Sequence, residues 1–171
     1  RGTRDKPTAP LANKTSQADA VAILGRALRR DFPLKLDLLG QTVDGLGTVA
    51  VSEGQTVAFR VEADRECYLG IWHVDGKGAI TLLFPNQHDQ DSLLAAGQPR
   101  SIPGQMDYSI RVTPAEGQEY LHIAASSQRW EIPHGQQHGP YAVFASAEER
   151  SRWDRHLRGV EHLVAADDGA A

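Results

Sequence analysis

The chain has one cysteine, Cys67, and it lacks both a long apolar run and a surplus of charge of either sign. A single cysteine excludes a disulfide bond within the chain. A helix that crosses a membrane needs about 18 or more consecutive apolar residues, and no stretch approaches this length. Lysine and arginine number 18 and aspartate and glutamate 22, which gives a net charge of −4. We therefore expect no transmembrane segment and no nucleic-acid partner.

What the chain does have is enough length and apolar content for one domain. Its 171 residues are 40% hydrophobic and 23% charged, an ordinary globular composition. Residues 1–14 are polar and contain prolines, so we expect a flexible leader there. Residues 15–165 are expected to form a single β-sandwich domain with flanking helices, and residues 166–171 a frayed tail.

The strongest local signal is a hairpin between residues 67 and 86. Its two arms, CYLGIWHV and AITLLF, are rich in aromatic and branched side chains, which fit a pleated sheet. Asp75 and Gly76 lie between the arms and favour a tight turn, and Gly78 also permits a longer loop. Because both arms are almost continuously apolar, we expect strands that are covered on both faces. Pro85 should end the second arm, since proline cannot donate a ladder hydrogen bond.

Alternation of apolar and polar residues predicts further strands on either side of this hairpin. The clearest are residues 34–39 (LKLDLL) and 56–63 (TVAFRVEA). Weaker candidates are shorter: residues 49–51, 100–102, 108–112 and 119–126, with a short apolar patch at Tyr141, Val143 and Phe144.

Two stretches show no clear strand pattern. Residues 87–104 are expected to be a loop with a helical turn and a buried Leu93-Leu94 pair, and residues 100–102 within it a short edge strand. Residues 127–140 contain several prolines and glycines and are expected to be irregular.

Helices are expected at both ends of the chain. The first should begin at Thr15 or Ser16 and end before Pro33. Ser146, followed three places later by Glu149, is a capping box that predicts the start of a second helix. Its apolar face would carry Trp153, Leu157, Val160 and Val164. Short strands separated by turns, with a helix at each end, indicate a mainly β fold: an antiparallel β-sandwich of immunoglobulin-like architecture.

Histidines give one candidate for metal chemistry. His134 and His138 are four residues apart, a spacing that places two imidazoles on one face of a helix. Prolines and glycines around them argue against a helix, and surface loop histidines are the simpler interpretation. His122 or His73 could supply a third ligand if the fold brings it near. The alternative function is a metal-dependent hydrolase that uses His122, His134 and His138. We otherwise expect no metal and no cofactor.

Other reactive side chains have simpler structural interpretations. Cys67 opens an apolar strand, where a small core residue is expected rather than a nucleophile. Asp89 and Asp91 lie in an oxygen-rich loop, but the spacing is not that of a calcium-binding loop. We therefore expect solvated carboxylates and no catalytic residue.

A binding role is best supported at Trp130 and its neighbour Arg129. Both lie in the irregular segment, where a loop tryptophan beside a charge can serve recognition as well as anchoring. With His134 and His138 they form the expected binding residues. Trp72, in mid-strand, is expected to lie in the core instead.

The central part of the chain resembles a bacterial family, the domain of unknown function 4384, over about residues 56–126. A glycine hairpin, an L-F-P-N turn, an I-P pair and an E-G-Q-E-Y-L strand entry carry the resemblance: Tyr68, Asp75, Gly76, Leu83, Phe84, Pro85, Asn86, Gly97, Ile102, Pro103, Gly117 and Glu119. The resemblance implies an all-β module of bacterial proteins, attached to kinases, peptidases or repeat proteins and favouring the periplasm or the cell exterior. It implies no activity and no catalytic residue. Phe84, Pro85 and Asn86 are interpreted as a core plug, a strand stop and a turn cap.

The sequence thus predicts a non-enzymatic accessory module that binds a protein partner or a cell-envelope component. A purely structural spacer is a further possibility. The oligomeric state is not predicted.

Overall fold

The computed structural model describes residues 9–24, 32–39, 54–104, 108–111, 119–158 and 164–165. The predicted strand at residues 49–51 and the predicted tail at residues 166–171 lie outside them. The elements follow in this order: α1 (Ala9–Leu24), β1 (Leu34–Leu39), β2 (Thr56–Ala63), β3 (Cys67–Val74), β4 (Ile80–Phe84), β5 (Leu93–Leu94), β6 (Arg100–Ile102), β7 (Ile110–Arg111), β8 (Tyr120–Ser126), β9 (Gln136–His138), β10 (Tyr141–Phe144), α2 (Ala147–Arg158) and β11 (Val164–Ala165).

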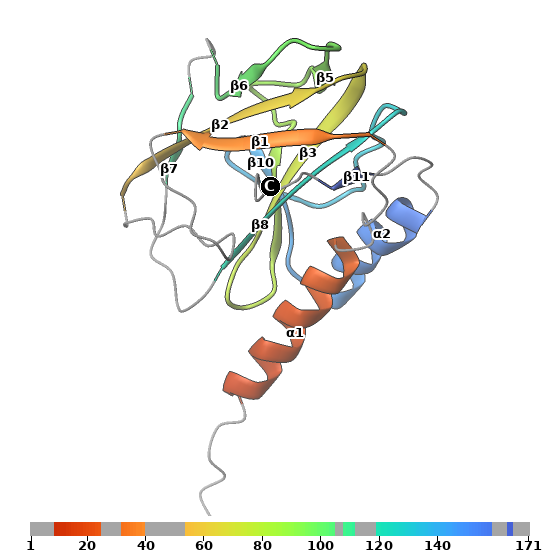
Figure 1. Ribbon diagram of the computed structural model, residues 1–171. Coiled ribbons are helices and arrows are strands. Elements are labelled where there is room, and N and C mark those ends of the chain that lie inside the picture. Colours follow the sequence, from red (N-terminus) through yellow and green to blue (C-terminus); the bar gives the residue numbers. More distant parts are fainter. Residues whose placement is uncertain are drawn as a thin grey trace, which may run out of the picture.

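The strands form two antiparallel sheets. The small sheet has the order β1-β2-β6, and β7 also pairs with β2. The large sheet has the order β11-β8-β3-β4-β10-β9, and β5 pairs with the start of β3. Figure 1 shows the small sheet on one side of the large sheet and the two helices on the other. The expected mainly β, antiparallel sandwich with a helix at each end is confirmed.

Each face of the large sheet has its own hydrophobic core, as β3 shows. Leu69 and Ile71 belong to the core between the sheets, whereas Trp72 and Val74 belong to the core beneath the helices. A bulge between Ile71 and Trp72 shifts the register against β4. The near-continuous burial of β3 and β4 confirms that both arms of the hairpin are covered on both faces.

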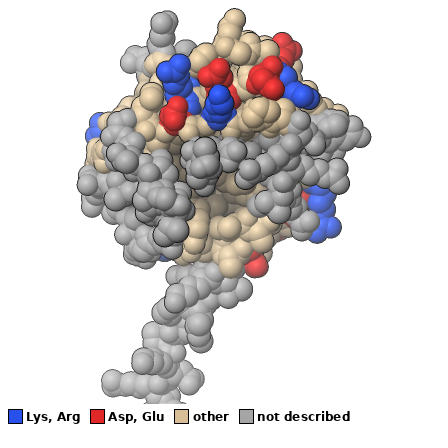
Figure 2. All heavy atoms as spheres, viewed as in Figure 1, with Lys and Arg blue, Asp and Glu red and all other residues tan. Residues whose placement is uncertain are grey.

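The outer face of the small sheet is charged and mixed in sign. The register of β1 and β2 places Lys35 opposite Glu62 and Asp37 opposite Arg60. Figure 2 shows Lys and Arg interleaved with Asp and Glu at the top of the molecule, where Figure 1 places this sheet. Opposite charges across neighbouring strands favour the pairing.

The hairpin turn also holds α1. Asp75 Oδ1 accepts hydrogen bonds from the backbone N–H groups of Lys77 and Ala79, both at 2.9 Å, and Gly78 has a φ of 86°. Gln17 of α1 donates to the carbonyl of Asp75 at 3.1 Å. A Cβ on Gly78 would lie 2.6 Å from the carbonyl oxygen of Ser16, so glycine is required here for conformation and for close packing alike.

The L-F-P-N turn after β4 is built as expected. Phe84 is fully buried and ends β4. Asn86 donates to the carbonyl of Leu83 at 2.8 Å, and its side-chain oxygen accepts from the backbone N–H groups of His88 (2.9 Å) and Asp89 (3.0 Å). These bonds confirm the plug, the strand stop and the turn cap.

The helix boundaries differ from prediction. α1 begins at Ala9, so part of the expected leader is helical. Pro10 falls in its first turn. Backbone N–H groups there have no partner within the helix, so a proline removes no hydrogen bond. α2 begins as expected, with the Ser146 hydroxyl accepting from the Glu149 backbone N–H at 3.1 Å. α2 ends at Arg158. Val164, which was expected on the apolar face of this helix, lies in β11 instead.

Two loop assignments are also corrected. Leu93-Leu94 forms β5, not part of a helical turn, because it pairs with Cys67 and Tyr68 at the free start of β3. Residues 136–138 of the expected irregular segment form β9, which pairs with β10 around a turn at Gly139 and Pro140.

Candidate binding groove

The β8–β9 connection crosses a face of the large sheet. β8 and β9 are separated by β3, β4 and β10, so residues 127–135 must pass over these strands. Trp130 fixes the crossing on the helix side, where its ring packs edge-on against Trp72 with centroids 5.5 Å apart. Arg152 of α2 donates to the carbonyl of His134 at 2.6 Å and holds the crossover against the helix.

Two adjoining hollows lie between this crossover and the loop that follows β4. The first has a volume of about 310 Å³ and is lined by Tyr68, Gln90, Asp91, Ser92, Leu93 and Arg129. The second, of about 320 Å³, has a larger lining: Leu82, Pro85, Asn86, Gln87, Gln90, Ser92, Arg129, Trp130, Ile132, Gln137, Pro140 and Ala142. Because Gln90, Ser92 and Arg129 line both hollows, we treat the two together as the Arg129 groove.

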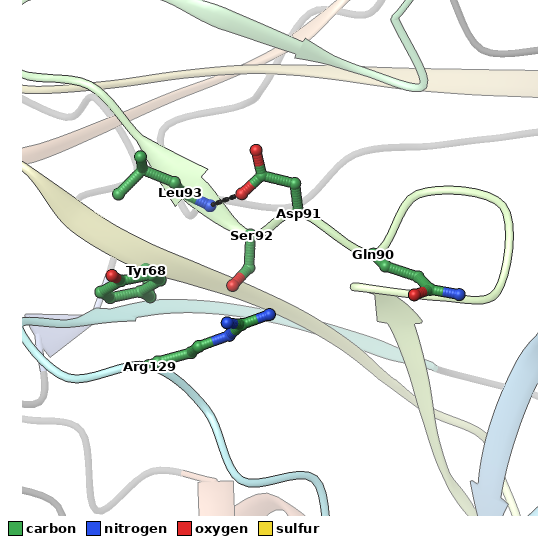
Figure 3. Close-up of a pocket in the computed structure, with 6 residues that line it drawn as sticks. All are labelled: Tyr68, Gln90, Asp91, Ser92, Leu93 and Arg129. Carbon is green, nitrogen blue, oxygen red and sulfur yellow. Dashed lines mark hydrogen bonds between the residues drawn. The ribbon is translucent and has the colours of Figure 1, made fainter.

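Polar groups meet where the two hollows join. Arg129 is exposed and forms no ion pair with another described residue. Ser92 is 5% exposed, and within the described residues its hydroxyl forms no hydrogen bond. In Figure 3 both side chains point into the space between β5 and the crossover. The Asp91 carboxylate, by contrast, already accepts a hydrogen bond from the backbone N–H of Leu93 at 3.0 Å.

The outer edge of β5 is closed to strand addition. The N–H of Leu93 donates to Asp91, and the carbonyl of Leu93 accepts from the Arg100 guanidinium at 2.9 Å. An unpaired strand edge would offer these groups to another chain. Side chains already satisfy them, so a ligand in the first hollow must be recognised through side chains and not by extending the sheet.

The predicted binding residues are only partly brought together. Arg129 and Trp130 both line the groove, but Trp130 is 7% exposed and serves mainly as core. His134 and His138 are exposed and line neither hollow. His138 lies on the edge strand β9, opposite Tyr141 of β10.

The histidines expected for a metal site have different surroundings. His122 lies on β8 opposite Trp72, with ring centroids 5.9 Å apart, and burial lowers its pKa to about 4. His134 and His138 are at the surface. Within the described residues, no group of three His, Cys, Asp or Glu side chains is placed to hold a metal ion. The hydrolase alternative therefore gains no support.

Two other reactive candidates have structural roles. Cys67 is fully buried, and desolvation raises its pKa to about 11, which suppresses the nucleophilic thiolate. Asp89 is buried and not solvated as expected: it accepts from Arg100 at 2.9 Å and from Tyr108 at 3.3 Å. Because the Asp89 carboxylate pairs with Arg100, it stabilises the loop and has a structural role.

Sequence reasoning missed most of the groove. Tyr68, Gln90, Ser92 and Ile132 carry no motif, and they meet only because β5 returns to β3 and the crossover passes beside them. The available signal for these residues was an isolated isoleucine, Ile132, in a proline-containing segment that is otherwise mostly polar. It is 47% exposed, one of the large apolar side chains left open to solvent.

Neither helix of the described residues combines the length and the apolar character that a membrane crossing requires.

Comparisons with known proteins identify only the central part of the chain. Residues 50–129 match the model of a family described as "Domain of unknown function (DUF4384)". The match reaches from β2 through β8 to Arg129, and it leaves out both helices and the strands β1, β9, β10 and β11. No curated protein and no solved structure matches the chain. The expected resemblance is confirmed by this match: residues 50–129 are similar to a family whose function is unknown.

Proposed function

We propose that this chain is a non-enzymatic binding module that holds a segment of a protein partner in the Arg129 groove. The observation that carries the proposal is the pair of adjoining hollows with Arg129 between them. Together they offer length, apolar walls and a few polar groups. Ligand sites in proteins combine these features.

The lining favours a polypeptide over other ligands. Its glutamine side chains can bond to backbone amides, while Ile132 and Pro140 offer apolar contacts. A sugar-like envelope component would need an exposed aromatic face for stacking. Trp130 presents little surface, because it packs against Trp72.

The non-enzymatic part of the proposal rests on the surroundings of the reactive side chains. Cys67 is buried with a raised pKa, and Asp89 is neutralised by Arg100. His122 is half-buried and packed against a tryptophan. Each has a structural explanation that needs no reaction.

Selection of peptides from a random displayed library against the full chain tests the proposal. Selected peptides would be synthesised, and their binding mapped by the NMR shifts of backbone amides. We expect shifts at Ser92, Arg129 and Ile132. Shifts confined to the charged face of β1 and β2, or a failure of any peptide to bind, would overturn the proposal.

A matched pair of variants sharpens the test. Ile132 lines the groove and is 47% exposed, whereas Leu39 is 41% exposed at the end of β1 in the other sheet. Ile132→Ala should weaken binding several-fold, because it removes apolar contact area. Leu39→Ala should leave the affinity unchanged.

A further inference from the structure

The junction of the two hollows contains an unused pair of hydrogen-bond donors. Ser92 is 95% buried, yet its hydroxyl faces the groove and bonds to no other described residue. The hydroxyl oxygen is not one of the fully buried atoms left without a partner, so it is the part of Ser92 that is open to the groove. The Arg129 guanidinium lines the same space and lacks an acidic partner within the described residues. Both groups are available to a ligand that carries acceptor oxygens.

Other arginines near this loop have their own partners. Arg100 bonds to Asp89 at 2.9 Å, and Arg152 bonds to the carbonyl of His134. Asp91, the acidic residue of the first hollow, is held by Leu93. Asp91 keeps its negative charge, but within the described residues it forms no ion pair with Arg129, so the guanidinium fork is free to bond to a ligand.

We propose that Arg129 and Ser92 form a subsite for a carboxylate, supplied by an aspartate or glutamate side chain of the bound segment. This rests on the proposed function. The guanidinium presents a planar fork that matches the two oxygens of a carboxylate, and the Ser92 hydroxyl adds a third donor. The flanking residues of the segment occupy the two hollows.

The position of the subsite distinguishes a side-chain carboxylate from a chain terminus. Gln90, Ser92 and Arg129 line both hollows, so apolar space extends in two directions from the donors. A segment that is bound through an internal acidic residue can fill both hollows. A terminal carboxylate would leave one hollow empty.

The lining charge favours a carboxylate over a phosphate. Within the described lining, Arg129 is the one cationic side chain, and Asp91 adds an anionic one. One guanidinium with a carboxylate nearby can accommodate a single negative charge more readily than two. A phosphate group carries close to two and is typically held by several arginines.

The test uses the peptides selected on the full chain and measures dissociation constants by fluorescence anisotropy. We expect an enriched acidic position, and replacing it by Asn or Gln should weaken binding by about tenfold or more. Arg129→Gln should weaken binding of the acidic peptide to a similar extent but leave the affinity for its Asn or Gln variant unchanged. Arg155→Gln, on the exposed face of α2, is the matched control and should change neither affinity.

Further variants keep the result interpretable. Ser92→Ala retains the backbone bond from Leu69 N–H to the Ser92 carbonyl and should weaken only the acidic peptide. Arg129→Glu should restore binding to a peptide with lysine at the acidic position. Peptides that bind in the groove without any acidic preference would overturn the subsite but leave the proposed function standing. If phosphoserine or a terminal carboxylate is strongly preferred, the side-chain assignment is wrong.

Discussion

Gly70 lies directly against the indole ring of Trp72. A Cβ built on Gly70 would lie 2.7 Å from Cζ3 and 2.9 Å from Cζ2 of the ring, closer than carbon atoms can pack. The two residues are on β3, and the ring of Trp72 contacts Trp130 of the crossover and Trp153 of α2 edge-on. The absence of a side chain at Gly70 thus lets one tryptophan join the sheet, the crossover and the helix.

Gly70→Ala should therefore destabilise the fold by about 1–3 kcal/mol, because the methyl group must displace the ring of Trp72. Urea unfolding followed by tryptophan fluorescence would measure the loss. In a Trp72→Leu background the same substitution should lower the free energy of unfolding by much less, because the smaller side chain leaves room for the methyl group. Equal costs in both backgrounds would show that the ring contact is not the cause.

Asn86 should be a second sensitive position, since its side chain makes three hydrogen bonds at a buried turn. Asn86→Ala removes all three and should cost about 2–3 kcal/mol, at about 1 kcal/mol for each bond. Asn86→Asp keeps the acceptor but sets a carboxylate against the Leu83 carbonyl, so it should also destabilise. Gln87→Ala, at the exposed neighbouring position, should change stability by less than about 0.5 kcal/mol. Thermal and urea unfolding of the three variants would test this order.

The parts of the fold that follow a local pattern were predictable. β1 and β2 match the predicted residues 34–39 and 56–63, because alternation with one buried face specifies both length and orientation. The hairpin of β3 and β4 was predictable because Asp-Gly separates two apolar runs.

The groove was not predictable in the same way. Arg129 and Trp130 were identified because a tryptophan beside a charge in a loop is noticeable. Ser92 was not identified, since its burial depends on the pairing of β5 with β3. The path of the crossover depends on β9 joining the far edge of the large sheet, a relationship between distant segments that no local pattern records.

Gly78 provides a test of how α1 is attached. Gly78→Ala introduces a Cβ 2.6 Å from the Ser16 carbonyl oxygen and strains a backbone with φ of 86°. Gly97→Ala strains a similar φ of 69° but meets no atom within 4 Å, so it is the matched control. We expect hydrogen exchange in α1 to accelerate for Gly78→Ala and to stay unchanged for Gly97→Ala. Equal exchange in both variants would show that the helix does not depend on close contact with the hairpin turn.

His122 should make the stability depend on pH. Its Nε2 atom is buried without a hydrogen-bond partner, and burial lowers its pKa from 6.5 to about 4. The unfolded chain therefore takes up a proton near pH 6.5 that the folded chain resists until about pH 4. Stability from this group is complete above pH 6.5 and declines as the pH falls toward 4, by up to about 3 kcal/mol.

His122→Phe isolates this effect, because it keeps a ring against Trp72 but cannot take up a proton. Unfolding free energies measured between pH 7 and pH 4 should fall less steeply for the variant than for the parent chain. His156, whose pKa burial also lowers, retains its share of the slope. Parallel curves for the parent chain and His122→Phe would mean that His122 takes up its proton equally well in the folded and unfolded chain.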